Sequence, residues 1–188
     1  MIRINGPAAL REVFWYPFTI IGWGMTFLRE TSRRLDDEHR ENLDLLDRVE
    51  QAFARQPRGR AAGDADLARL AAALARALEQ EIGRHFDFEE TELFPRLAAA
   101  GEGDIAELLA DEHGAIREVA AELLPRARAA AAGTLDADGW QALQRGVLEL
   151  IERMVSHIQK ETMALLPMLD DLLDEETDRE LAFAYAVG

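Results

Sequence analysis

Two segments of the sequence repeat the same pair of polar residues inside an otherwise apolar helix pattern. The segments RHFDFEETELFPRL (84–97) and SHIQKETMALLPML (156–169) each contain a His-x-x-x-Glu motif. Aligned without a gap at a spacing of 72 positions, His85, Glu89, Pro95 and Leu97 match His157, Glu161, Pro167 and Leu169. Imidazole nitrogens and carboxylate oxygens together suit iron, manganese or zinc. The repeat therefore indicates a metal site with two similar halves.

The other two of the four histidines are repeated as well. Asp37-Glu38-His39 and Asp111-Glu112-His113 lie 74 positions apart. His39 falls on an apolar stripe that also contains Leu35, Leu43, Leu46 and Phe53, and His113 on one that contains Ile105, Leu109, Ile116 and Ala120. The chain thus reads as a duplicated helical hairpin, in which each copy supplies one His and then one His-x-x-x-Glu.

Four long helices must position these residues. They are predicted over 25–55, 64–98, 104–131 and 136–173, with Asp64 and Asp104 as N-caps of the second and third. Short breaks between long helices make neighbours antiparallel. Strand-type alternation is not visible. The predicted fold is therefore all-α, an up-down-up-down four-helix bundle, and the tail DEETDRELAFAYAVG is compatible with a short extra helix.

Helix geometry places the four histidines in one layer. At about 1.5 Å per residue, the first helix continues roughly 24 Å beyond His39, and the second travels roughly 30 Å to His85. The second hairpin gives roughly 27 Å past His113 and roughly 31 Å back to His157. Each glutamate lies one turn beyond its histidine on the same face. That face is buried, because both motifs continue apolar stripes with steps of three and four, among them Leu143, Val147, Leu150, Met154, Leu165, Met168 and Leu172.

Two carboxylates in an apolar core require a positive partner. Without one, each would cost several kcal/mol, and two close together would repel each other. The stripes offer no Lys or Arg, unless Arg117 or Arg153 turns inward. A lone His on an apolar face is usually a hydrogen-bonded core residue, but four at repeated spacing favour bound cations. The predicted metal ligands are His39, His85, Glu89, His113, His157 and Glu161.

The remaining acidic residues near these motifs receive lesser roles. Asp87, Glu90 and Glu92 are interpreted as solvated helix charges without a function. Glu38 and Glu112, each directly before a His, are interpreted as supporting partners of the ligands or as surface charges. The sequence contains no visible Gly-rich phosphate loop and no Ser/His/Asp constellation, so no catalytic residue and no organic cofactor site is predicted.

Composition narrows the class of protein. The 188 residues are enough for one domain with a real core, and the absence of Cys excludes thiolate sites and disulfides. A net charge of −15 argues against nucleic-acid binding. The uncharged stretch 13–28 is interrupted by Pro17, Gly22 and Gly24 and is shorter than the about 20 residues of a membrane span.

These features lead to an expected organisation. Residues 1–26 form an aromatic N-terminal arm that packs on the bundle or on a second subunit of a homo-oligomer, residues 27–173 form the bundle, and residues 174–188 form a tail. The default is a soluble cytoplasmic protein, and a membrane-surface anchor is the lesser alternative.

Over roughly residues 27–172 the sequence resembles the hemerythrin-like, or HHE cation-binding, family. The resemblance rests on His39, His113 and the two His-x-x-x-Glu motifs in their order along four helices. It implies a non-haem site with two iron ions and an oxo or hydroxo bridge; manganese or zinc rank below iron. His39 and His85 would bind one ion, His113 and His157 the other, and Glu89 and Glu161 would bridge them.

The sequence departs from the oxygen carriers of that family at two positions. The carriers have a fifth His one turn after the third-helix His, where this chain has Arg117, and an Asp where it has Glu161. Open metal positions then favour a protein that binds or senses oxygen or a related small ligand. The alternatives are a di-iron enzyme acting on peroxide or nitric oxide, iron storage, a structural metal bundle, and a metal-free interaction module.

Overall fold

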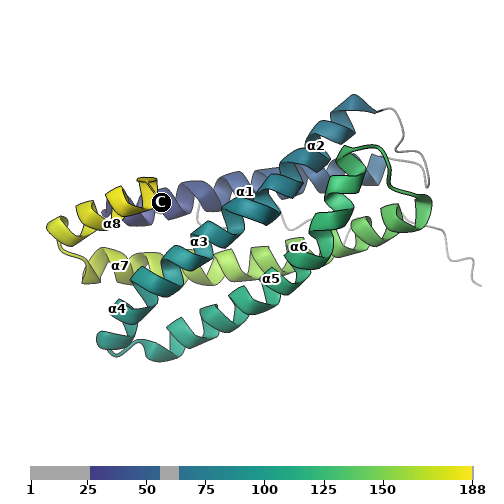
Figure 1. Ribbon diagram of the computed structural model, residues 1–188. Coiled ribbons are helices and arrows are strands. Elements are labelled where there is room, and N and C mark those ends of the chain that lie inside the picture. The colour runs from purple at the N-terminus through teal and green to yellow at the C-terminus, as the bar shows by residue number, and fades with distance from the viewer. Residues whose placement is uncertain (1–25, 56–63, 188) are drawn as a thin grey trace, which may run out of the picture.

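The computed structural model describes residues 26–55 and 64–187, and over these ranges all regular structure is helical (Figure 1). There are five continuous helical runs within the described ranges. They are α1 (Glu30–Arg55); α2 (Ala65–Arg76), η2 (Ala77–Glu81), α3 (Ile82–Phe88), η3 (Glu89–Leu93) and α4 (Phe94–Ala99); α5 (Gly103–Ala131); α6 (Ala137–Lys160), η4 (Glu161–Leu165) and α7 (Leu166–Leu172); and α8 (Glu175–Val187). The all-α class is confirmed, while the helix count exceeds the predicted four by α8.

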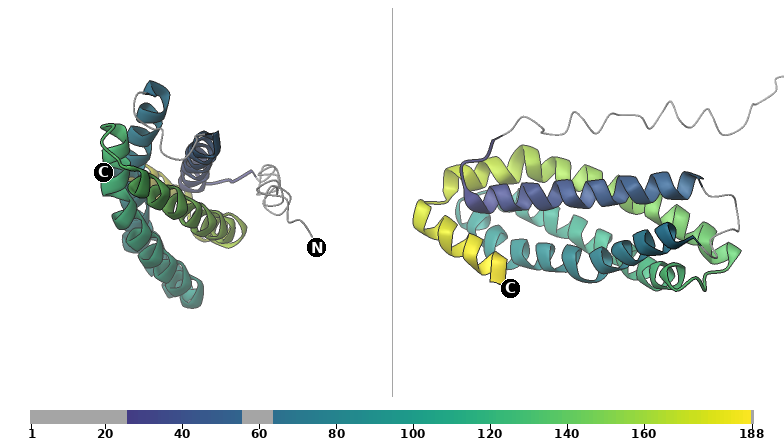
Figure 2. Two further views of the ribbon diagram at one scale, coloured as in Figure 1. Left: turned by 90° about the vertical axis from the view of Figure 1, so that its right-hand side faces the viewer. Right: turned by 90° about the horizontal axis from the view of Figure 1, so that it is seen from above.

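The four longer runs lie side by side (Figures 1 and 2). Both α2 and α6 contact α1 and α5, so each long run has two neighbours. Their inner faces form two apolar clusters. One contains Val49, Leu74 and Leu150, and the other contains Leu97, Leu109 and Leu169. The histidines and glutamates of the repeated motifs lie between these clusters along each run, so the core is divided by a polar layer.

Helix ends follow the sequence signals in part. The predicted N-cap Asp64 accepts hydrogen bonds from the backbone N–H groups of Asp66 and Leu67, at 3.0 and 3.1 Å. The prediction for Asp104 is wrong, because α5 already begins at Gly103 and Asp104 lies in its first turn. Gly101, with φ of +96°, reverses the chain directly after α4, and α5 begins two residues later.

Both long runs that carry a His-x-x-x-Glu motif widen into a π-helical turn at the glutamate. In η3 the N–H of Phe94 bonds to the carbonyl of Glu89, and in η4 that of Leu166 bonds to the carbonyl of Glu161. Pro95 and Pro167 follow. A proline lacks the N–H and its ring collides with the carbonyl four residues earlier, so an adjacent wider turn relieves the clash. The repeated proline therefore accompanies a repeated backbone distortion at the carboxylate.

The C-terminal segment is a helix docked on the bundle. α8 folds back over the start of α1 (Figure 1). The Asp178 side chain accepts hydrogen bonds from the backbone N–H groups of Glu30 (2.8 Å) and Thr31 (2.9 Å), and therefore caps α1 from a distant part of the sequence. Leu181 and Tyr185 are buried against the bundle.

Some predictions about the chain ends differ from the structure or fall outside it. Leu172, predicted on the buried stripe, is 41% exposed, because the run ends there. Residues 1–25 lie outside the described residues, so the packing of the N-terminal arm, residues 1–26, stays a prediction. Within the described ranges, no helix has an apolar stretch long enough to cross a membrane.

Candidate metal centre

The six predicted ligands meet in the polar layer of the core. Each is at most 3% exposed. Each of the four longer runs supplies one histidine, from α1, α3, α5 and α6, and the two glutamates stand at the first positions of η3 and η4. The prediction that the histidines share one height therefore agrees with the structure: His39, His85, His113 and His157.

The histidines form two pairs. The Nε2 atoms of His39 and His85 are 3.1 Å apart, and those of His113 and His157 are 3.0 Å apart. We call these the His39 pair and the His113 pair. With both glutamates, each pair makes a group of four donors that lie within 4.8 Å of one another.

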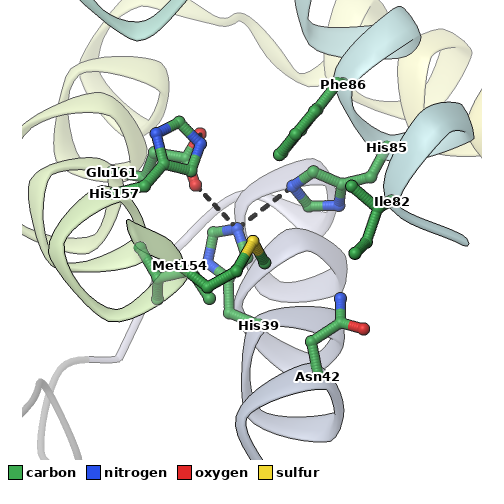
Figure 3. Close-up of a pocket in the computed structure, with 9 residues that line it drawn as sticks. His39, Asn42, Ile82, His85, Phe86, Met154, His157 and Glu161 are labelled. Carbon is green, nitrogen blue, oxygen red and sulfur yellow. Dashed lines mark hydrogen bonds and ion pairs between the residues drawn. The ribbon is translucent and has the colours of Figure 1, made fainter. Parts of the chain in front are cut away.

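Each glutamate presents one oxygen to each pair. The two oxygens of Glu161 lie 2.9 Å from Nε2 of His39 and 2.9 Å from Nε2 of His157. Those of Glu89 lie 3.3 Å from Nε2 of His85 and 3.3 Å from Nε2 of His113. None of these four oxygens is aligned for a hydrogen bond. Close approach without alignment is expected when donor atoms face a common centre, as Figure 3 shows around His39.

The donor set fits divalent cations. Two ligands about 2.1 Å from a metal ion and at a right angle to each other are about 3.0 Å apart, which matches these separations. Neither Arg117 nor Arg153 pairs with Glu89 or Glu161. Arg117 pairs with Glu90 and Asp87, and Arg153 pairs with Glu149. Two buried carboxylates thus remain without a Lys or Arg partner among the described residues.

Three of the four imidazoles are held from behind by a carboxylate. Nδ1 of His85 lies 3.1 Å from Glu38, and Nδ1 of His157 lies 3.0 Å from Glu112. A carboxylate can only accept, so Nδ1 carries the proton and Nε2 is free to face the centre. Glu38 and Glu112, each reaching across to the neighbouring helix, are therefore the supporting partners that one of the two interpretations foresaw.

The interpretation of Glu90 as a merely solvated helix charge is wrong. Its carboxylate lies 2.8 Å from Nδ1 of His113 and accepts a hydrogen bond from Arg117 at 2.6 Å. Glu90 lies off the apolar stripe of its own helix, so the stripe gave no reason to place it near the site. The repeat gave none either, because Thr162 occupies the corresponding position in the second motif. Glu92 pairs with Arg96 at the surface.

The duplication breaks at His39. Its Nδ1 is buried and has no hydrogen-bond partner among the described residues. Its counterpart His113 has Glu90 behind it, whereas the residue equivalent to Glu90 is Thr162. The two pairs therefore offer similar inner donors in unequal surroundings.

The electrostatics show a cluster that holds protons when no cation is present. Burial alone would lower the pKa of His85, but the charge of Glu89 and the hydrogen bond that His85 donates to Glu38 raise it to about 10. Burial opposes protonation of His113 too, yet Glu161 and Glu89 raise its pKa to about 9. Burial would raise the pKa of Glu161, but His157 and His39 hold it well below its usual value. Binding of a cation at Nε2 would therefore release protons.

One residue near the centre had no sequence signal at all. Tyr185 of α8 is 4% exposed, its hydroxyl donates a hydrogen bond to Glu38, and its oxygen lies 3.0 Å from Nδ1 of His85. It stands outside the repeat, so spacing could not reveal it. A narrow, mainly apolar pocket without room for a water molecule adjoins His39, His85, His157 and Glu161 (Figure 3). Its other lining residues are Asn42, Ile82, Phe86, Met154 and Ile158.

Comparison with known protein families identifies a match over most of the chain. The profile of the Hemerythrin HHE cation binding domain matches residues 30–169. This range contains all six converging donors and ends before α8. A search of curated proteins found no match to the chain.

Proposed function

Because the chain belongs to the hemerythrin HHE cation-binding family, we propose that its buried cluster binds two iron ions and that this centre binds or senses oxygen or a related small ligand. The His39 pair is assigned to one ion and the His113 pair to the other, while Glu89 and Glu161 bridge them within an up-down-up-down bundle of the four longer runs. The observation that carries the proposal is the division of each carboxylate between the two pairs.

The ligand count favours a centre that takes up an additional ligand. Each ion would have two imidazoles and two carboxylate oxygens, fewer than the six donors of octahedral coordination. Arg117 stands where the family's oxygen carriers have another His. Its guanidinium has no acceptor atom, stays cationic and is engaged by Glu90 and Asp87. The position therefore supplies no further imidazole, and bound iron would offer a reducible centre with an open coordination position.

The surrounding residues of this chain support that role. Glu38, Glu90 and Glu112 accept from Nδ1 of three imidazoles and so orient Nε2 of each toward the centre, where it can bind a cation. The side chains that line the narrow pocket beside His39, His85 and His157 are mainly apolar, which disfavours bulk water at the centre. Together these features favour a sheltered binding centre.

A second candidate is an enzyme that turns over peroxide or nitric oxide at the same centre. The open positions that follow from Arg117 favour it equally, because a reactant needs a place to bind. Iron storage and a structural metal bundle are the non-catalytic alternatives. They predict, respectively, iron beyond two ions per chain and a metal such as zinc that stabilises the fold without oxygen-dependent change.

The test is metal analysis of the purified full chain with absorption spectra before and after exposure to oxygen. We expect two iron ions per chain and an iron-dependent near-ultraviolet band that changes with oxygen. Glu89→Gln should lose iron, whereas Glu92→Gln, on the outside of the same turn, should retain it. A chain that takes up no Fe(II) under anaerobic conditions rejects the proposal. Turnover of peroxide or nitric oxide that Glu89→Gln abolishes and Glu92→Gln preserves would favour the enzyme.

A further inference from the structure

The C-terminal helix α8 reaches the candidate metal centre, although it lies outside both the sequence repeat and the matched family range. Its start is fixed by Asp178 at the first turn of α1. Its last turns place Tyr185 in the core beside α3. α8 is therefore attached at both ends, with the second attachment directly behind the His39 pair.

Tyr185 is held by several contacts at once. The guanidinium of Arg84 lies 4.5 Å from the centre of the tyrosine ring and donates a hydrogen bond to the Tyr185 carbonyl at 3.0 Å. The ring also packs against Phe88, with 4.5 Å between ring centres. These contacts with the ring and with the backbone carbonyl restrict the side chain, and so they also hold its hydroxyl in one place.

That hydroxyl closes a small network with Glu38 and His85. It donates to Glu38, and its oxygen lies within hydrogen-bonding distance of the His85 Nδ1–H, which also faces Glu38. Arg84 donates to the other oxygen of Glu38 at 2.6 Å. Each oxygen of Glu38 thus has a partner from another element, and the orientation of His85 depends on both.

In the part of the chain that the structure describes, no tyrosine contacts Glu112 or His157 of the second half. There Glu112 contacts Nδ1 of His157 and receives a single cationic partner, Lys160, at 2.8 Å. Glu112 is 27% exposed and lies on the face of α5 toward α6. The inner donors of the two halves match, so the tyrosine is a feature of the His39 pair.

From this arrangement we propose that Tyr185 is a positioning residue of the metal centre, which fixes Glu38 and thereby His85, so that α8 is part of the site on the His39 side. The inference rests on the proposed function, because it concerns cation binding by the assigned ligands. The effect is specific to one half of the site. Loss of the hydroxyl weakens cation binding at the His39 pair and leaves cation binding at the His113 pair unchanged. Supporting residues of this kind alter metal affinity about 10- to 100-fold.

The experiment compares the full-length chain and Tyr185→Phe, both stripped of metal and titrated with Co(II), whose visible spectrum reports its ligand geometry. We expect two equivalents in both proteins, with one binding step about tenfold weaker in Tyr185→Phe and a change in the spectrum of that step alone. Phe183→Leu, at an exposed position of the same helix, is the matched control and should behave as the unaltered chain.

Variants with a single remaining position identify the affected half. His113→Ala leaves the His39 side, where Tyr185→Phe should weaken binding; His39→Ala leaves the other side, where it should have no effect. Glu38→Gln should weaken the His39 side too, and Tyr185→Phe should add little in that background, since the tyrosine acts through Glu38.

The outcomes separate this inference from the proposed function. Unchanged affinities, tighter binding on the His39 side, or equal weakening of both steps in Tyr185→Phe would overturn the role of Tyr185 while leaving the metal centre in place. If the unaltered chain binds no Co(II) and no Fe(II), the proposed function fails and this inference fails with it.

Discussion

Replacement of Glu161 by Gln tests whether a shared carboxylate joins two cation sites. Glu161 is fully buried, and its oxygens approach His39 and His157. Gln has nearly the same volume but no charge, so it removes one donor charge from both positions. In the metal-free protein this breaks buried ion pairs at a cost of about 3–5 kcal/mol. The relevant quantity is therefore the additional stability that a cation gives each variant.

The size of that effect follows from mass action. At a free cation concentration 100 times Kd, each site stabilises the fold by about 2.7 kcal/mol, and two sites by about 5 kcal/mol. At about 2–4 °C per kcal/mol for a protein of this size, Tm rises by about 11–22 °C. A 100-fold loss at both sites leaves about 0.4 kcal/mol per site, and hence a rise in Tm of about 2–3 °C.

The assay is thermal unfolding followed by circular dichroism, with and without Zn(II) as a redox-inert probe. Glu152→Gln, an exposed position of α6, removes the same charge and should keep the full rise in Tm. Glu161→Asp retains a carboxylate and should keep most of it. An equal rise in Tm for Glu161→Gln and the unaltered chain would refute the bridging assignment.

Three further results are expected. Asp178→Ala removes the hydrogen bonds to the first turn of α1 and should lower the free energy of unfolding by about 1 kcal/mol in urea titrations, whereas the exposed Glu180→Ala should not. The folded-state pKa values of His85 (about 10) and His113 (about 9) exceed 6.5, so their protonation stabilises the metal-free protein fully below pH 6.5. That stability is lost as pH rises through about 9 to 10, and denaturation at pH 6 and pH 10 should show the loss without metal but not with it. The variant His39→Ala keeps only the His113 site, and His113→Ala keeps only the His39 site. Calorimetric titration should find the cation roughly tenfold more tightly bound in His39→Ala, because Nδ1 of His39 has no carboxylate behind it whereas Nδ1 of His113 has Glu90.

The sequence predicted the parts of the structure that depend on a helix and its own buried face. The all-helical class and most ends of the long runs followed from apolar periodicity and from breaks such as AGEGD. The exception is the first helix, which was predicted from about residue 25 and begins at Glu30. Convergence of the six donors followed because residues spaced by 72 and 74 positions share one stripe and one height. Such inferences need only helical geometry, because the spacing of residues along one helix determines which face they share and how far apart they lie.

The missed features depend on contacts between elements. Glu90 lies off its own stripe and matters only because α5 brings His113 beside it. Tyr185 and Asp178 belong to α8, whose docking side no repeat encodes. The π-helical turns were not predicted either, although the prolines that accompany them were part of the recognised motif. A pattern along one helix contains no information about which neighbour covers its flanks.

Contacts between elements also explain how the two cation positions of such a centre can come to differ. Duplication produced two matched sets of inner donors, and with equal surroundings the two positions would bind and react alike. The surroundings are unequal: Glu90 stands behind His113 while Thr162 takes the equivalent place near His39, and a tyrosine from α8 supports only His85. Among the residues that the structure describes, His39 is therefore the one imidazole of the four without a carboxylate behind it. In the proposed centre, we expect the His113 position to hold its cation more tightly than the His39 position.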